Sequence, residues 1–67
     1  MNRIAIERAY QQSRINEFRA TQARYRAALQ RGNLTASDRD FLERAVAGYD
    51  KAISDAQWMR DNAVTLA

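Results

Sequence analysis

Gly32-Asn33-Leu34-Thr35 is the one clear break in a chain of 67 residues that otherwise favours helix nearly throughout. The chain has no Pro, its two Gly residues stand at positions 32 and 48, and Ala is abundant. No segment sustains the alternation of apolar and polar residues that is typical of a strand. We therefore expect a single all-α domain over residues 1–67, with one helix over about 3–31 and a second over about 36–64.

The residues around the break predict where the helices begin and end. Asn2 can cap the first helix, and Arg31 followed by Gly32 fits a helix end, since Gly can adopt a positive φ. Thr35 and Asp38 form a variant of the capping box, with Ser37 as a competing cap. A connection this short requires antiparallel neighbours, so we expect a helical hairpin.

The apolar residues lie on one face of the second helix but on two faces of the first. The second helix gathers Leu42, Ala45, Val46, Tyr49, Ala52, Ile53, Ala56, Met59 and Ala63. The first helix has a heptad-spaced seam of Ile4, Ile15, Phe18, Tyr25 and Leu29, interrupted by Arg8, Gln11 and Gln22. Nearly opposite the seam lies an outer stripe of Ile6, Ala9, Tyr10, Ser13, Ala20, Ala23 and Ala27. A hairpin alone covers only one of these two faces.

The uncovered face predicts association with a second copy of the chain. Below about 70–80 residues a single core rarely suffices without a disulfide, a metal or a partner, and this chain has neither Cys nor His. We therefore expect two hairpins to dimerise into a four-helix bundle. The residues expected in the core or the dimer contact are Ile4, Ile6, Tyr10, Ile15, Phe18, Tyr25, Leu29, Leu42, Val46, Tyr49, Ile53 and Met59. Gly48, inside the second helix, marks either an exposed position or a close approach of a neighbouring helix.

The two halves of the chain differ in charge. Residues 1–33 carry seven Arg against two Glu, a sum of +5, whereas residues 34–67 carry four basic residues against six acidic ones, a sum of −2. Arg8, Arg19 and Arg26 form a ridge along the first helix that could follow a phosphate backbone. The same arginines could instead face the acidic second helix. A helix-turn-helix is excluded, because the helix after the turn is net acidic and would be repelled by DNA.

Catalysis is poorly supported by the residues present. The chain has no His or Cys, no Gly-rich phosphate loop and no nucleophile beside an obvious base. Asp38, Asp40 and Glu43 cluster near a helix start, where the helix dipole alone explains acidic residues. We expect no enzyme activity, no cofactor, no metal and no small-molecule substrate.

Trp58 is the leading candidate for contact with a protein partner. It lies on the face of the second helix opposite Tyr49, near Lys51, where a hairpin would leave it exposed. Trp is enriched among interface hot spots. Alternatively, a bend at the end of the helix or the dimer contact would bury this side chain.

The plan of two long helices joined by a tight turn resembles Rop, a small plasmid regulator that dimerises into a four-helix bundle and binds RNA on one face. Hairpins of this size are also common among accessory proteins of phages and other mobile elements. No apolar run approaches the roughly 18 residues needed to span a bilayer, so we expect a cytoplasmic location and no membrane partner. We expect a regulatory or accessory protein that binds itself and an unidentified protein; the alternative is a regulator that binds RNA or DNA through Arg8, Arg19 and Arg26.

Overall fold

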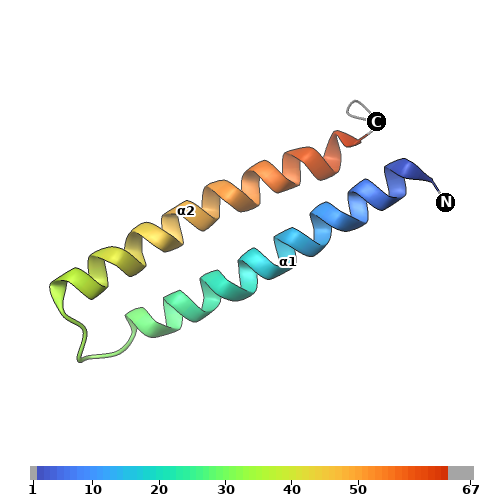
Figure 1. Ribbon diagram of the computed structural model, residues 1–67. Helices are drawn as coiled ribbons and strands as arrows, with labels where there is room; N and C mark the ends of the chain where they lie inside the picture. Colours follow the sequence, from blue (N-terminus) through green and yellow to red (C-terminus); the bar gives the residue numbers. More distant parts are fainter. Residues whose placement is uncertain (1, 64–67) are drawn as a thin grey trace.

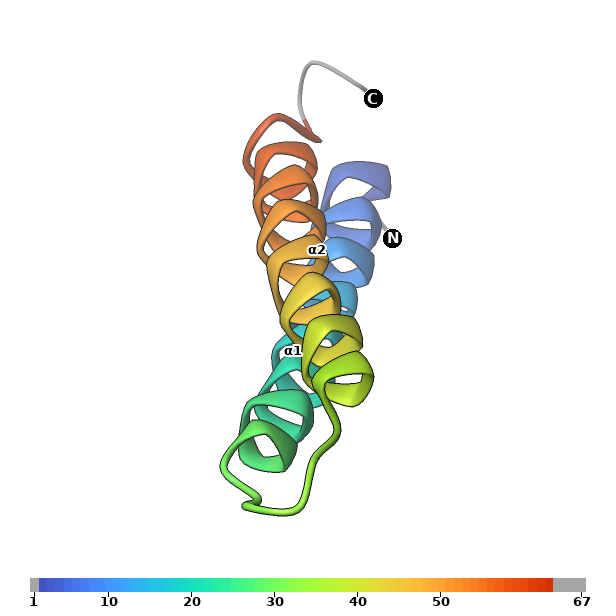
Figure 2. The same ribbon diagram turned by 90° about the vertical axis from the view of Figure 1, so that its left-hand side faces the viewer.

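The computed structural model describes residues 2–63 and contains two helices packed side by side as a hairpin, as the sequence predicts. Helix α1 spans Arg3–Leu29 and helix α2 spans Ala36–Asp61. The two helices run antiparallel over their whole length (Figures 1 and 2), and the molecule measures 50 × 16 × 11 Å. The loop occupies one end of this rod and both ends of the described chain lie at the other.

Both helix starts are capped as expected. The Asn2 side chain accepts a hydrogen bond from the Ile4 amide at 2.9 Å. At α2, the Thr35 hydroxyl accepts from the Asp38 amide at 3.0 Å, and the Asp38 carboxylate accepts from the Thr35 amide at 3.4 Å. The reciprocal pair satisfies two backbone donors at the helix start, so Thr35 rather than Ser37 is the cap.

Helix α1 ends at Leu29, two residues earlier than its predicted end. The Gln30 amide donates to the carbonyls of Ala27 and Ala28, and the Arg31 amide donates to the Ala28 carbonyl. The final turn therefore tightens into i to i+3 bonds, which satisfy these carbonyls without a left-handed residue. Gly32 has no positive φ, so the expected left-handed helix cap is wrong. The predicted end of α2 at residue 64 lies outside the described residues.

Of the two apolar faces of α1, the heptad seam is the one that packs on the apolar face of α2. Ile15 is fully buried and contacts the cluster formed with Ile53 and Ala56, against which Phe18 packs. Tyr49 lies between Phe18 and Tyr25, with ring centroids 5.9 and 5.8 Å apart. Tilted ring pairs at these separations add a favourable electrostatic contribution to the burial of their surface.

The two glutamines of the seam are buried and hydrogen-bonded in different ways. Gln22, 5% exposed, donates from Nε2 to the Val46 carbonyl at 2.9 Å and to Asp50 Oδ1 at 2.6 Å. Gln11, 1% exposed, donates to Glu7 at 2.9 Å within α1. Of these two glutamines, only Gln22 links the two helices, and it does so at one fixed position along the long axis of the rod. A polar residue in a seam of this kind specifies register.

Replacing Thr35 by Ala should lower the free energy of unfolding by about 1 kcal/mol, because the Asp38 amide at the start of α2 loses the hydroxyl that accepts its hydrogen bond. Urea denaturation followed by circular dichroism measures the change. Ser37→Ala is the matched control, since Ser37 makes no cap bond. Equal effects of the two substitutions would show that the capping box is not the source of the stability.

Gln22 and Asp50 should be energetically coupled by about 1–2 kcal/mol, the contribution expected for a hydrogen bond to a charged group near the surface. A double-mutant cycle with Gln22→Leu and Asp50→Ala, read out by urea denaturation, measures this coupling. Asp40→Ala replaces Asp50→Ala in the control cycle, since Asp40 pairs with Arg44 on its own helix. Additive effects of Gln22→Leu and Asp50→Ala would contradict the assigned link.

Candidate protein-binding surfaces

The packing of the seam leaves the hairpin with two long flanks of different chemistry. Contacts between the helices identify one of them: Arg60 donates to Gln12 at 2.8 Å, and Arg26 lies 3.8 Å from Asp50. Helical geometry adds the neighbouring positions. This polar flank consists of Arg8, Gln12, Arg19, Arg26 and Gln30 of α1 with Arg39, Glu43, Asp50, Gln57 and Asp61 of α2.

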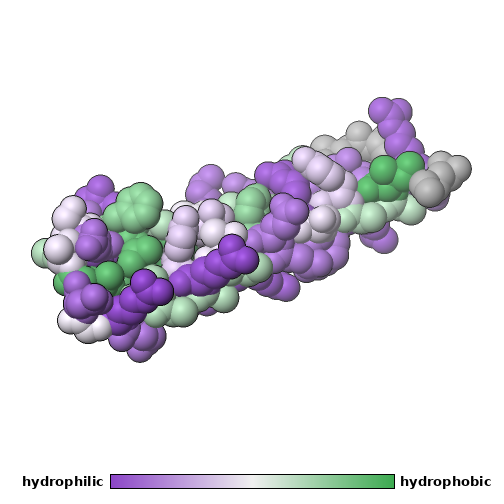
Figure 3. Space-filling view, turned by 60° about the horizontal axis from the view of Figure 1, so that its bottom comes forward, coloured by the Kyte–Doolittle hydropathy of each residue, from purple (hydrophilic) through white to green (hydrophobic). Residues whose placement is uncertain are grey.

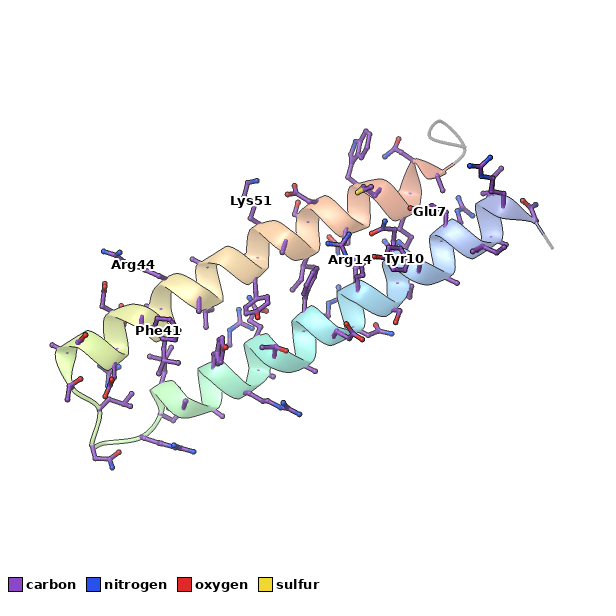
Figure 4. All side chains as sticks on the ribbon, in the orientation of Figure 1. Glu7, Tyr10, Arg14, Phe41, Arg44 and Lys51 are labelled. Atoms are coloured by element: carbon purple, nitrogen blue, oxygen red, sulfur yellow. The ribbon has the colours of Figure 1, made fainter. Side chains whose placement is uncertain are left out.

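The opposite flank is largely apolar. Helical geometry places on it Tyr10, Thr21, Tyr25 and Ala28 of α1 with Phe41, Ala45, Gly48, Ala52 and Met59 of α2. We call this set the apolar flank. Two of its large side chains are well exposed, Tyr10 at 57% and Phe41 at 65%, and they lie towards opposite ends of the rod (Figure 4). The packing of α1 on α2 therefore leaves large aromatic side chains of the apolar flank exposed towards both ends of the rod.

The N-terminal half of α1 also brings charged groups to this side of the molecule, since helical geometry places Arg3, Glu7 and Arg14 on the same face as Tyr10. The Arg14 guanidinium lies over the rings of Tyr10 and Phe18, 5.8 and 5.3 Å from their centroids. On α2, Asp55 lies at the edge of the flank and pairs with Lys51 at 3.3 Å. The charged groups of Arg14 and Asp55 remain near solvent, so they can also form ion pairs with a neighbouring molecule.

The candidate nucleic-acid residues Arg8, Arg19 and Arg26 lie together on the polar flank, and α2 brings carboxylates to the same flank. Arg26 is near Asp50. The pKa of Asp61 is held below its ordinary value mainly by the hydrogen bond from Arg60, and the charge of Arg8 acts in the same direction. The positive ridge is therefore partly neutralised by the second helix.

The outer stripe of α1 is exposed, as expected for a face that α2 does not reach. Ile6 is 50% exposed, and Ala9, Ser13, Ala20, Ala23 and Ala27 are all exposed. Figure 3 shows this side of the molecule, where apolar surface is separated by polar side chains along the middle of the rod. Apart from Ile6 and Tyr10 the stripe offers only small side chains, and Tyr10 lies where the stripe meets the apolar flank.

Trp58 is 57% exposed, on the part of α2 turned away from α1. Lys51 and Arg44 point outwards from the same helix (Figure 4). Lys51 pairs with Asp55, and Arg44 with Asp40 at 3.2 Å, each along one helix turn. The outer face of α2 thus combines one large aromatic side chain with short-range ion pairs.

Phe41 is the functional candidate that the sequence analysis missed. Its signal was present, because Phe41, Ala45, Gly48, Ala52 and Met59 follow helical spacing on α2. The sequence analysis assigned Ala45, Ala52 and Met59 to the buried face of the second helix and did not consider Phe41. Gly48 belongs to the same pattern: a Cβ added there meets nothing within 4 Å, so α1 does not approach this position closely.

The part of the chain that the structure describes contains neither clustered metal ligands nor a helix suited to crossing a membrane. Residues 2–63 contain no group of three or more Asp, Glu, His or Cys side chains placed to hold a metal ion. Neither α1 nor α2 combines the length and the apolar character that a bilayer crossing requires. Comparison with protein-family models, curated proteins and solved structures finds no match to this chain.

Trp58 is the chain's single tryptophan, so its fluorescence reports on the outer face of α2. In the purified protein we expect emission typical of an indole in water and ready quenching by acrylamide, because the side chain is more than half exposed. The quenching constant should stay within about twofold of that of free N-acetyl-tryptophanamide, scaled for slower diffusion of the protein, since partial exposure leaves the ring open to collisions. Strong protection at concentrations where the chain self-associates would instead place Trp58 in the contact between copies.

Proposed function

We propose that this chain is a non-enzymatic regulatory or accessory protein that acts by protein–protein binding as a helical homodimer. The observation that carries the proposal is the imbalance between what the hairpin buries and what it exposes. Within residues 2–63 the buried hydrophobic residues are Ile15, Ile53, Ala56 and Ala63, whereas Ile6, Tyr10, Phe41 and Trp58 are all at least half exposed. A surface of this kind is typical of a protein that functions in association.

Stability supports the same conclusion. Full burial of an Ile side chain contributes roughly 1.5–3 kcal/mol, and Ala contributes less. Two Ile and two Ala residues are a small buried set for two helices of 27 and 26 residues, whose ordering costs conformational entropy at every position. Burial of the apolar flank against another helical surface would add the half-buried residues Tyr25, Ala52 and Met59 to the core.

The charge distribution favours a protein partner over nucleic acid. Arg8, Arg19 and Arg26 would have to bind phosphates beside Asp50 and Asp61, which lie on the same flank. Affinity for nucleic acid depends on the number of phosphates neutralised, and neighbouring carboxylates oppose each such contact. The outer face of α2, with Trp58 and Lys51, stays free when the apolar flank is covered, and we assign it to the further protein partner.

Homodimer formation predicts that the thermal midpoint rises with protein concentration, because association stabilises the folded state by mass action. Sedimentation equilibrium at micromolar concentrations should give twice the chain mass of 7.7 kDa. A fully helical monomer at these concentrations, with a midpoint independent of concentration, would contradict the proposal.

Phe41→Ala and Trp58→Ala form a matched pair, because the two side chains are similarly exposed on different faces of α2, about 100° apart around the helix. Phe41→Ala should raise the dimer dissociation constant about tenfold, the effect of losing roughly 1.4 kcal/mol at an interface. Trp58→Ala should leave that constant unchanged. The reverse result would move the dimer contact to the outer face of α2.

A further inference from the structure

We infer that the apolar flank binds a second copy of this chain face to face, with both loops at the same end of the bundle, so that α1 of each copy lies on α2 of the other. The inference rests on the proposed homodimer and specifies its contact surface and orientation. A face-to-face stack of two identical hairpins has two symmetric solutions. In the first, the loops lie at the same end and α1 of each chain packs on α2 of the other. In the second, the loops lie at opposite ends, and α1 packs on α1 and α2 on α2.

The internal register shows which residues would meet when the loops share an end. Within the hairpin, Gln12 and Arg60 lie at the same position along the long axis of the rod, which we call a level, and so do Gln22 and Asp50. A two-fold axis along the rod keeps each level unchanged and exchanges the helices. Tyr25 of one copy therefore faces Gly48 of the other.

The same symmetry fixes the contacts nearer the ends. By this register Ala28 is level with position 44 and Tyr10 with position 62, so Phe41 and Met59, three residues away on the same face of α2, lie within one helix turn of them. The flexible thioether of Met59 adapts readily to an aromatic ring.

The shapes of the two helices favour this arrangement. Along the middle of the apolar flank α2 presents Ala45, Gly48 and Ala52, and the position of Gly48 is open. At the same levels α1 presents Thr21 and Tyr25. Placing α1 on α2 sets large side chains against small ones, which keeps the spacing between the two layers even. With the loops at opposite ends, small residues of α2 would meet their own copies while the larger residues of α1 met theirs.

Charge favours the same solution. Within their helical bounds, α1 has six Arg and two Glu, which gives +4, and α2 has four basic and six acidic residues, which gives −2. The same-end arrangement places these opposite charges side by side in the dimer, and the opposite-end arrangement places like charges together. Complementary potentials of this kind fix the register of an interface.

One specific ion pair follows from the register. Arg14 lies on the apolar flank of α1, near the level of Asp55 at the edge of that flank on α2. In the same-end dimer, Arg14 of each copy faces Asp55 of the other. With the loops at opposite ends, antiparallel pairing of the two α1 helices would place Arg14 near Glu17 instead.

The distance between the two loops distinguishes the orientations directly. The chain has no Cys, so Asn33→Cys introduces a single spin-label site in the loop. Pulsed electron paramagnetic resonance on the full chain should give a distance of roughly 10–30 Å between labels, because packed helical layers lie about 10 Å apart and the labels extend from them. Opposite-end loops would give a distance near the 50 Å length of the rod and would overturn the inference.

Charge exchange tests the contact itself. Arg14→Glu alone and Asp55→Arg alone should each raise the dimer dissociation constant about threefold to tenfold, as expected for a partly exposed ion pair replaced by a repulsive one. The double variant should restore the constant to within about twofold of the original, since the pair reforms with its signs reversed. Arg39→Glu, on the polar flank, should have a smaller effect.

Failure of the inference is separable from failure of the proposed function. A dimeric mass with a loop-to-loop distance near the length of the rod keeps the homodimer and removes this orientation. A dimer that Gly48→Glu leaves intact removes the apolar flank as the contact, with Ala47→Glu on the outer face as the matched control. A monomeric mass at all concentrations removes both proposals.

Discussion

Two antiparallel helices share a single contact seam, and the organisation of this molecule depends on that seam. The seam buries Ile15, Ile53 and Ala56 with the aromatic ring of Phe18 against them. Gln22 adds the one polar link from the interior of α1 to α2, through the Val46 carbonyl and Asp50. Because a hydrogen-bonded amide in an apolar seam tolerates only one alignment, this link fixes the levels of all other residues along the rod. The chemistry of each flank then follows from that register.

The register separates polar from apolar surface more sharply than either helix does alone. Each helix carries mostly polar residues on one side of its seam and its small and aromatic residues on the other, where α1 adds Arg14 over the rings of Tyr10 and Phe18. Antiparallel packing brings the two polar sides together, as the pair of Arg26 with Asp50 and the bond from Arg60 to Gln12 show. The two remaining sides then form one apolar flank, bounded by Tyr10 and Phe41. A surface assembled from both helices in this way is larger than any stripe on one of them.

Local patterns were sufficient to predict the hairpin. The Asn2 and Thr35 caps depend on side chains within three residues of each helix start, and the seam depends on heptad spacing, so both can be read from the sequence. The end of α1 could not be read in this way. Gly32 suggested a left-handed cap, but carbonyl bonds from Gln30 and Arg31 had already closed the last turn.

The flanks required information that no single helix contains. Phe41 and Gly48 lie beside the buried stripe of α2, and their role depends on which residues of α1 come level with them. The alignment of the two helices, and with it the partner of each flank residue, is set by contacts separated by more than twenty residues in sequence, such as Gln22 with Asp50.

The distribution of charge over the surface also depends on how the two helices pack. The sequence shows a basic half and an acidic half, but only the packed hairpin shows that Asp50 and Asp61 share a flank with the Arg ridge. That shared flank weakens the positive field available to a phosphate backbone, while the apolar flank and the exposed Trp58 remain available for protein contacts.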